Sequence, residues 1–134
     1  MENRTVLDTN IWVDFFISKR TRELIELIDQ NKAVFLRSKP AIAEFERVLS
    51  YEKFKKYKFN VVRTLAFYEA MTKYVETQEL FKDCPDKKDN FLFDLAIQGN
   101  TKYLVSRDKT VLATPIPGTH IKKMTFPQFK EDFQ

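Results

Sequence analysis

Short apolar runs alternate with amphipathic stretches along the chain. Three apolar runs, at residues 5–7, at residues 33–36 and directly after Lys102, are short and contain β-branched or aromatic side chains, which favours buried strands. Between and after the first two runs, apolar residues recur at the i, i+3, i+4 spacing of a helix that buries one face. These positions are Leu24, Ile25, Leu27 and Ile28, followed by Ile42, Phe45, Val48 and Leu49. The pattern predicts alternating strands and helices.

Capping residues, prolines and a glycine indicate where the other elements begin and end. Thr9 and Asn10 precede a short apolar helical segment, and Ser38 with Pro40 opens the helix that carries Phe45. We further expect a helix at 60–74, a return toward the sheet at 74–80, a polar loop at 82–89, a helix from 90 to 99, a last strand at 120–124 and a terminal helix at 125–133.

The alternation of strands and helices predicts the fold class. Strands that follow one another through helices form a mainly parallel sheet with helices on both faces and right-handed crossovers. We therefore predict an α/β fold with three layers. At 134 residues the chain has the length of one ordinary domain, so residues 1–134 are assigned to a single domain.

Composition narrows the classes of protein to consider. Hydrophobic residues make up 43% of the chain and charged residues 31%, which is typical of a soluble globular domain. No apolar run approaches the roughly 20 residues of a membrane helix, and the N-terminus lacks the apolar core of a signal peptide. We therefore expect a cytoplasmic protein without membrane association. The net charge of +4 fits a polyanionic partner.

The scarcity of cysteine and histidine limits the chemistry. Cys84 is the single cysteine and His120 the single histidine, so the chain has no set of soft ligands for zinc and no internal disulfide. Nothing near His120 resembles a nucleophile elbow, which disfavours Ser-His-Asp and Cys-His catalysis. Any metal here must be bound by oxygen atoms.

Four acids stand where such oxygen ligands are expected. Asp8 and Asp108 each follow an apolar strand, while Glu44 and Asp89 lie in the first turns of two predicted helices. In open α/β sheets ligands bind beyond the carboxyl ends of the strands. Two carboxylates about 4 Å apart would repel by about 4 kcal/mol at an effective dielectric constant of 20, so a divalent cation is the natural counter-charge. Oxygen ligands favour Mg²⁺ or Mn²⁺.

The third acid and two neighbouring polar residues have alternative explanations. Asp86, Asp89 and Asp94 are all candidates near the start of one helix, and Asp89 also suits a helix cap. Asp94 falls about 140° round the helix from Asp89, so we expect a side participant or an exposed acid. Asn10 is expected to orient Asp8 or its bound water, and Ser106 to do the same beside Asp108, unless both residues only cap helices.

A basic and aromatic stretch follows the third helix. Lysines alternate with Phe54, Tyr57 and Phe59 between residues 51 and 63, a composition that suits a nucleic-acid strand. The alternative is a helix connection whose aromatics are core and whose lysines are solvated. The candidate contacts to a nucleic-acid backbone are Lys53, Lys55, Lys56, Lys58, Lys102, Arg107 and Lys109.

The four acids and their flanking residues resemble the motifs of the PIN domain family, over nearly the whole chain. Val-Leu-Asp8-Thr-Asn-Ile looks like the opening motif, Ala-Glu44-Phe the second, Asp89-Asn-Phe-Leu-Phe-Asp-Leu-Ala the third and Tyr-Leu-Val-Ser-Arg-Asp108 the fourth. Residues 86–96 are similar to a subgroup of toxins with the pattern Asp-x-x-Asp-Asn-x-Phe-Leu-x-x-Ala. The alignment of Leu92 and Ala96 favours Asp89 over Asp86 as the third acid.

The resemblance implies a function. PIN domains are metal-dependent ribonucleases and include the VapC-type toxins of toxin-antitoxin pairs. It implies that Asp8, Glu44, Asp89 and Asp108 hold one or two Mg²⁺ or Mn²⁺ ions for hydrolysis of RNA. It also implies a cognate antitoxin, which would cover the cleft or insert a basic side chain among the acids, and a homodimer.

Two other functions remain open at this point. The chain could be a non-catalytic RNA-binding or protein-interaction module in which the acids are vestigial. It could also be a DNA nuclease with the same metal site, because the groups that read the 2′-hydroxyl of RNA are not identifiable in the sequence.

Overall fold

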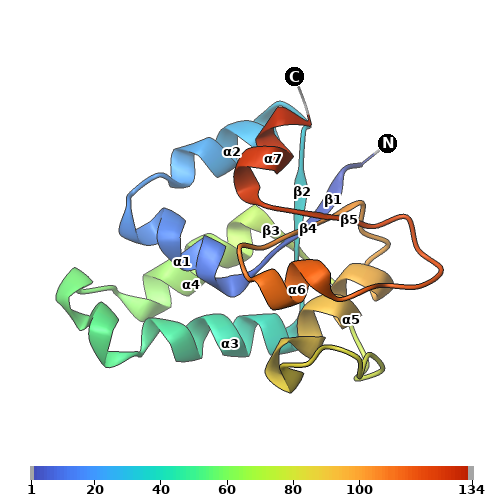
Figure 1. Ribbon diagram of the computed structural model, residues 1–134. Coiled ribbons are helices and arrows are strands. Elements are labelled where there is room, and N and C mark those ends of the chain that lie inside the picture. Colours follow the sequence, from blue (N-terminus) through green and yellow to red (C-terminus); the bar gives the residue numbers. More distant parts are fainter. Residues whose placement is uncertain (1, 133–134) are drawn as a thin grey trace.

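Five strands form one parallel sheet within residues 2–132, the part of the chain that the computed structural model describes (Figure 1). The strands are β1 (Arg4–Leu7), β2 (Val34–Arg37), β3 (Thr72–Tyr74), β4 (Tyr103–Val105) and β5 (Lys122–Met124). Their spatial order is β3-β2-β1-β4-β5, and every neighbouring pair is parallel. The predicted α/β fold is confirmed, and its sheet is parallel throughout the described residues.

The helices that connect these strands begin largely where the sequence places caps. They are α1 (Thr9–Ile17), α2 (Thr21–Asp29), α3 (Lys39–Leu49), α4 (Val61–Met71), α5 (Asn90–Gln98), α6 (Lys109–Ala113) and α7 (Phe126–Glu131), with 3₁₀ turns η1 (Glu52–Tyr57) and η2 (Lys87–Asp89). The side chain of Ser38 accepts a hydrogen bond from the Ala41 amide, and that of Asn60 from the Arg63 amide. In the described range, every helix falls short of the length and apolarity that a membrane span requires.

Successive side chains along the strands point to opposite faces of the sheet and form two separate hydrophobic cores. Leu7, Phe35 and Val105 face one side, where they pack with α1, α2, α3, α4 and α7. Val6, Leu36 and Leu104 face the other side and pack with α5, α6 and the start of α3. Figure 1 shows α7 lying against α2, consistent with the 3.2 Å contact between Lys130 Nζ and Glu23 Oε1. The result is the predicted three-layer arrangement.

The strand order creates a switch point between β1 and β4. From β1 the chain proceeds outward to β2 and β3, and it then returns to place β4 on the other side of β1. The two strands are joined at their carboxyl ends, where the Asp8 amide donates to the Val105 carbonyl over 2.9 Å. In parallel α/β sheets the crevice beyond such a switch point is where ligands bind.

The edge strand β3 corrects one prediction. We expected residues 60–74 to be helical and the return to the sheet to follow at 74–80, but α4 ends at Met71 and β3 occupies Thr72–Tyr74. Arg37 of β2 explains the difference. Its guanidinium donates to the carbonyl oxygens of Glu69 (3.0 Å) and Thr72 (2.7 Å), which lie at the end of the helix and the start of the strand. This side chain satisfies carbonyls that a longer helix would have paired internally.

Two other helix ends can be compared with the sequence pattern. Gly99 was expected to end its helix, and it does, but at an ordinary φ of −83°. A Cβ atom there would lie 2.6 Å from Leu36 Cδ1, so close packing against β2 explains the glycine, while Asn100 takes the left-handed conformation at φ 52°. The terminal helix was predicted to reach Phe133; α7 ends at Glu131, and Phe133 lies outside the described residues.

Candidate functional site

Three aspartates stand at the starts of three helices. Asp8 begins α1, Asp89 begins α5 and Asp108 begins α6. Asp108 uses its carboxylate as a cap and accepts from the Thr110 amide at 2.8 Å. Within the described residues, the carboxylates of Asp8 and Asp89 form no such cap bond. Both carboxylates lie at positions where the partial positive charge of a helix start favours an anion.

Ser106 connects the two strand-end acids. Its buried hydroxyl donates to Asp8 Oδ2 at 2.7 Å and accepts from the Asp108 amide at 3.0 Å. We expected this serine to act beside Asp108, and the structure shows that the carboxylate it contacts is that of Asp8. The hydrogen bond fixes the orientation of Oδ2 of Asp8.

The charges of these acids act on one another. Burial raises the pKa of Asp8, and the charge of Asp108 adds to this effect, while the hydrogen bond from Ser106 opposes it. Partial burial, followed by the charges of Asp8, Asp86 and Asp108, raises the pKa of Asp89 to about 6. The carboxylates at the ends of β1 and β4 and at the start of α5 are thus close enough to repel each other.

The donor set fits a hard divalent cation. It consists of carboxylate oxygens, one of which accepts a hydrogen bond from the Ser106 hydroxyl. A cation would offset both the burial of Asp89 and the repulsion from neighbouring carboxylates, which together raise its pKa. Within residues 2–132, however, no three side chains of His, Cys, Asp or Glu already stand together as a set that could hold a metal ion. The three aspartates share one edge of the sheet without forming a closed coordination shell.

Glu44, the fourth expected acid, is engaged elsewhere. It lies on α3 with a half-buried side chain, and Arg47 binds both of its oxygens, at 2.6 and 3.1 Å. The same guanidinium donates to the Tyr51 hydroxyl at 2.6 Å. Arg47 was not among the predicted site residues, although its i+3 spacing from Glu44 on a helix is a signal for such a pair.

Asp86 and Asp94 have different local roles. Asp86 caps η2 by accepting from the Lys88 amide. Asp94 was expected to be a side participant or an exposed acid, and exposure is wrong, because its side chain is only 5% exposed. Its Oδ1 accepts from the amides of Leu80 (3.1 Å) and Phe81 (2.8 Å), so this acid holds the segment before η2 in place. Such a contact between distant segments has no local sequence signal.

The other predicted residues are spread over the molecule. Asn10 is exposed in the first turn of α1, and among the described residues its side chain makes no hydrogen bond to Asp8. The lysines at 53, 55, 56 and 58 are exposed on and beside η1, while Phe54 and Phe59 pack against the core. Eleven residues of α3, about 16 Å of helix, separate η1 from the start of that helix. The exposed lysines fit either of the two predicted roles, a nucleic-acid surface or a helix connection with solvated lysines.

The three remaining basic residues lie at both ends of β4. Lys102 precedes the strand and rests over the Tyr103 ring, so it lies at the opposite edge of the sheet from Asp108. Arg107 and Lys109 flank Asp108 and are exposed, and Arg107 pairs with Asp14. Only the latter two are beside the acids.

Comparisons with known proteins agree with this architecture. The sequence model of a family described as PIN domain matches residues 4–110. The crystal structure of VapBC2 from Rickettsia felis, bound to a DNA fragment from its promoter, matches with a TM-score of 0.59 and 16% identity over 90% of this chain and 96% of that chain. PAE2754 from Pyrobaculum aerophilum matches with a TM-score of 0.60 and 12% identity over 98% of this chain and 90% of that chain. No curated protein matches the sequence significantly.

Proposed function

The chain belongs to the PIN domain family, and from this premise we propose that it is a metal-dependent endoribonuclease that hydrolyses phosphodiester bonds of RNA. The observation that carries the proposal is the position of Asp8 and Asp108 on either side of the β1/β4 switch point, with Asp89 near enough to interact with both. Catalysis of this kind needs acids gathered where a ligand can reach them, at the carboxyl ends of the strands.

We assign the binding of Mg²⁺ or Mn²⁺ to Asp8, Asp89 and Asp108, with Glu44 as a fourth ligand. A bound ion would activate water and stabilise the charge that develops on the scissile phosphate. Ser106 orients Asp8 through its hydroxyl. Arg47 now occupies both oxygens of Glu44, so Glu44 joins the site only when this ion pair opens. An RNA phosphate is a suitable alternative partner for the guanidinium.

Asp8→Asn tests the proposal directly. Loss of one anionic ligand is expected to reduce Mn²⁺-dependent cleavage of a single-stranded RNA at least 100-fold, while the circular dichroism spectrum and the melting temperature stay close to those of the unsubstituted protein. Asp29→Asn is the matched control, because Asp29 is exposed at the end of α2. Cleavage by Asp8→Asn at the rate of this control would exclude the mechanism.

We further propose that the ribonuclease is the toxin of a toxin-antitoxin pair. The support is family membership together with the likeness of fold to VapBC2. The antitoxin would cover the acids, and a homodimer is also expected. Induced expression in a bacterium should arrest growth, and Asp8→Asn should relieve the arrest. A partner encoded beside the gene should co-purify with the chain and suppress its cleavage of RNA.

A non-catalytic PIN-like module is the second candidate, favoured by the ion pair that occupies Glu44 and by the open arrangement of the three aspartates. Titration with Mn²⁺ separates the two candidates. A nuclease binds the ion through Asp8 and Asp89 and loses RNA cleavage in chelator, whereas a module binds RNA equally well with and without chelator. Parallel assays on RNA and DNA of the same sequence exclude or establish a DNA nuclease.

A further inference from the structure

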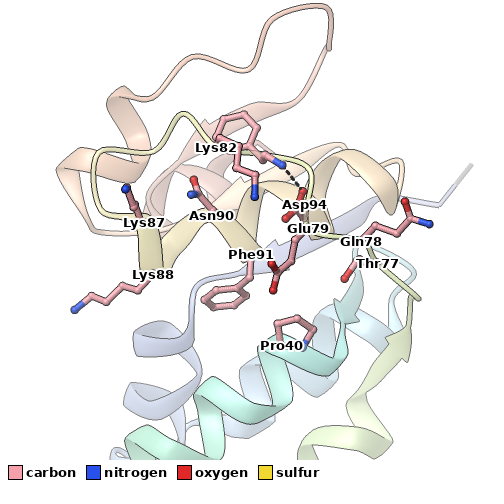
Figure 2. A pocket seen from close by; sticks show the side chains of 11 residues that line it. Pro40, Thr77, Gln78, Glu79, Lys82, Lys87, Lys88, Asn90, Phe91 and Asp94 are labelled. Carbon is pink, nitrogen blue, oxygen red and sulfur yellow. Dashed lines mark hydrogen bonds between the residues drawn. The ribbon is translucent and has the colours of Figure 1, made fainter.

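A cavity of about 600 Å³ lies between the start of α3, the start of α5 and residues 77–82 (Figure 2). Its volume is in the range of small-molecule sites in proteins. Asp89 is not part of the lining, but its chain neighbours Lys88 and Asn90 are. Because consecutive Cα atoms are about 3.8 Å apart, the cavity adjoins the acid site without overlapping it.

The lining combines an aromatic wall with two carboxylates. In the view of Figure 2, the ring of Phe91 lies to the left of Pro40 and the carboxylate of Glu79 lies beside that ring. Asp94 also lines the cavity. All hydrogen bonds that it accepts from described residues, those from Leu80, Phe81 and Gln98, end on Oδ1. Its Oδ2 is therefore an acceptor that remains for a ligand.

The rim of the cavity is basic. Lys82, Lys87 and Lys88 are exposed and contribute to the lining, and Figure 2 shows Lys87 and Lys88 together at the left of the view. Both lysines belong to η2, whose last residue is Asp89. A ligand with an aromatic body, hydrogen-bond donors at one edge and attached phosphates would match all three parts of this cavity. A nucleotide of single-stranded RNA has these properties, because its base is free to stack on a ring and to be read at its Watson–Crick edge.

We propose that this cavity is a subsite for a guanine base of single-stranded RNA, with the base against Phe91, its donor edge toward Glu79 and Asp94, and its phosphates toward the rim lysines. Guanine is favoured because its N1–H and its 2-amino group are adjacent donors that a carboxylate can accept together. Adenine and cytosine offer one amino group beside a ring acceptor, and uracil offers one N–H between two carbonyls. A carboxylate repels these neighbouring acceptors. The role as an RNA subsite rests on the ribonuclease function proposed above.

Binding can be measured without cleavage in the Asp8→Asn protein, with chelator present. The probes are RNA pentamers that differ only in the central base, which is G, A, C or U among uridines, and titrations are followed by amide NMR shifts. We expect the G pentamer to bind at least tenfold more tightly than the other three, with shifts at Phe91 and residues 77–82. Equal binding of the four pentamers would overturn the proposal.

Substitution of Glu79 separates base recognition from general RNA affinity. Glu79 is exposed, so Glu79→Gln should fold normally, and we expect it to bring the G pentamer to within about threefold of the A pentamer. The matched control is Glu46→Gln on the exposed side of α3, which should keep the tenfold preference. If the preference for the G pentamer persists in both Glu79→Gln and Phe91→Leu, the cavity does not recognise the guanine base.

The same pentamers distinguish failure of this proposal from failure of the proposed function. If the unsubstituted protein cleaves RNA with Mn²⁺ but binds the four pentamers equally, the ribonuclease stands and the guanine subsite is wrong. If it binds the G pentamer selectively but cleaves no RNA, the guanine subsite stands and the ribonuclease is wrong. A third outcome also overturns the proposal. If a protein partner displaces the G pentamer and Glu79→Gln does not change the affinity for that pentamer, the cavity is a protein-docking site.

Discussion

Ser106 has the most direct effect on the geometry of the aspartates at the carboxyl ends of β1 and β4. It follows β4, it is fully buried, and its single hydroxyl contacts the Asp8 carboxylate and the Asp108 amide at the same time. Its position after an apolar strand was evident from the sequence, but its partner was not, because the contact to Asp8 spans 98 positions along the chain. Long-range contacts of this kind depend on strand order, which local patterns do not specify.

Ser106→Ala should destabilise the fold and loosen the site. The substitution removes the donor to Asp8 and leaves the Asp108 amide without this acceptor, so we expect the free energy of unfolding to fall by about 1–3 kcal/mol. The affinity for Mn²⁺ should also fall, since Asp8 would no longer be oriented. Urea unfolding and Mn²⁺ titration measure the two effects. Ser18→Ala, at an exposed position, should change neither, and equal behaviour of the two variants would contradict this role.

At the scale of elements, the sequence predicts most strands and helices, because the apolar spacing and the caps reflect local physics. Strands β1, β2, β4 and β5 and the starts of α3 and α4 lie where the pattern places them. The edge strand β3 was missed because a side chain from β2, Arg37, ends α4 and pairs with Thr72. The exposure predicted for Asp94 was also wrong, since its burial results from contacts with a segment before α5. Gly99 ends its helix as predicted, but its close packing against Leu36 of β2 was not evident from the sequence.

Asp94 connects α5 to the segment that follows β3, and Asp94→Ala should release that segment. Two backbone amides, of Leu80 and Phe81, would lose their acceptor, so we expect a loss of about 2–4 kcal/mol in the free energy of unfolding and faster hydrogen exchange at both amides. Asp94→Asn, which keeps a carbonyl oxygen, should lose less. The control is Asp83→Ala, because Asp83 is exposed and lies two residues after Phe81. Slow hydrogen exchange at the amides of residues 80 and 81 in Asp94→Ala would refute the role of Asp94 as their acceptor.

At the scale of the whole molecule, the sheet order brings distant acids to one edge. The sequence alone marks Asp8 and Asp108 as strand ends, and their convergence follows from β1 and β4 being neighbours at the switch point. The i+3 spacing of Glu44 and Arg47 permits an ion pair, but the sequence does not show that this pair occupies both oxygens of Glu44. The strand ends could therefore be predicted from local pattern, whereas side-chain pairing required the folded chain.

This convergence makes stability depend on pH. The pKa of Asp89 is raised from 3.8 to about 6, so between these values the folded protein retains a proton that the unfolded chain has released. The free energy of unfolding should therefore fall as pH rises through this window. In chelator we expect a loss on the order of 1 kcal/mol, because solvent screens a partly exposed carboxylate. Urea unfolding at several pH values measures the slope, which should become shallower in Asp89→Asn, where only Asp8 with its raised pKa remains, and should be unchanged in Asp29→Asn.

The helices that begin at Asp8, Asp89 and Asp108 lie on opposite faces of the sheet, α1 on one and α5 and α6 on the other. An ion bound among these carboxylates would cross-link the two outer layers at the carboxyl ends of the strands, because its ligands would come from the first turns of helices on both faces of the sheet. An ion at 100 times its dissociation constant would add about 2.7 kcal/mol to the free energy of unfolding. Ion loading would then set the rigidity of the molecule as a whole, and the loaded and unloaded forms would differ in how easily the two layers separate.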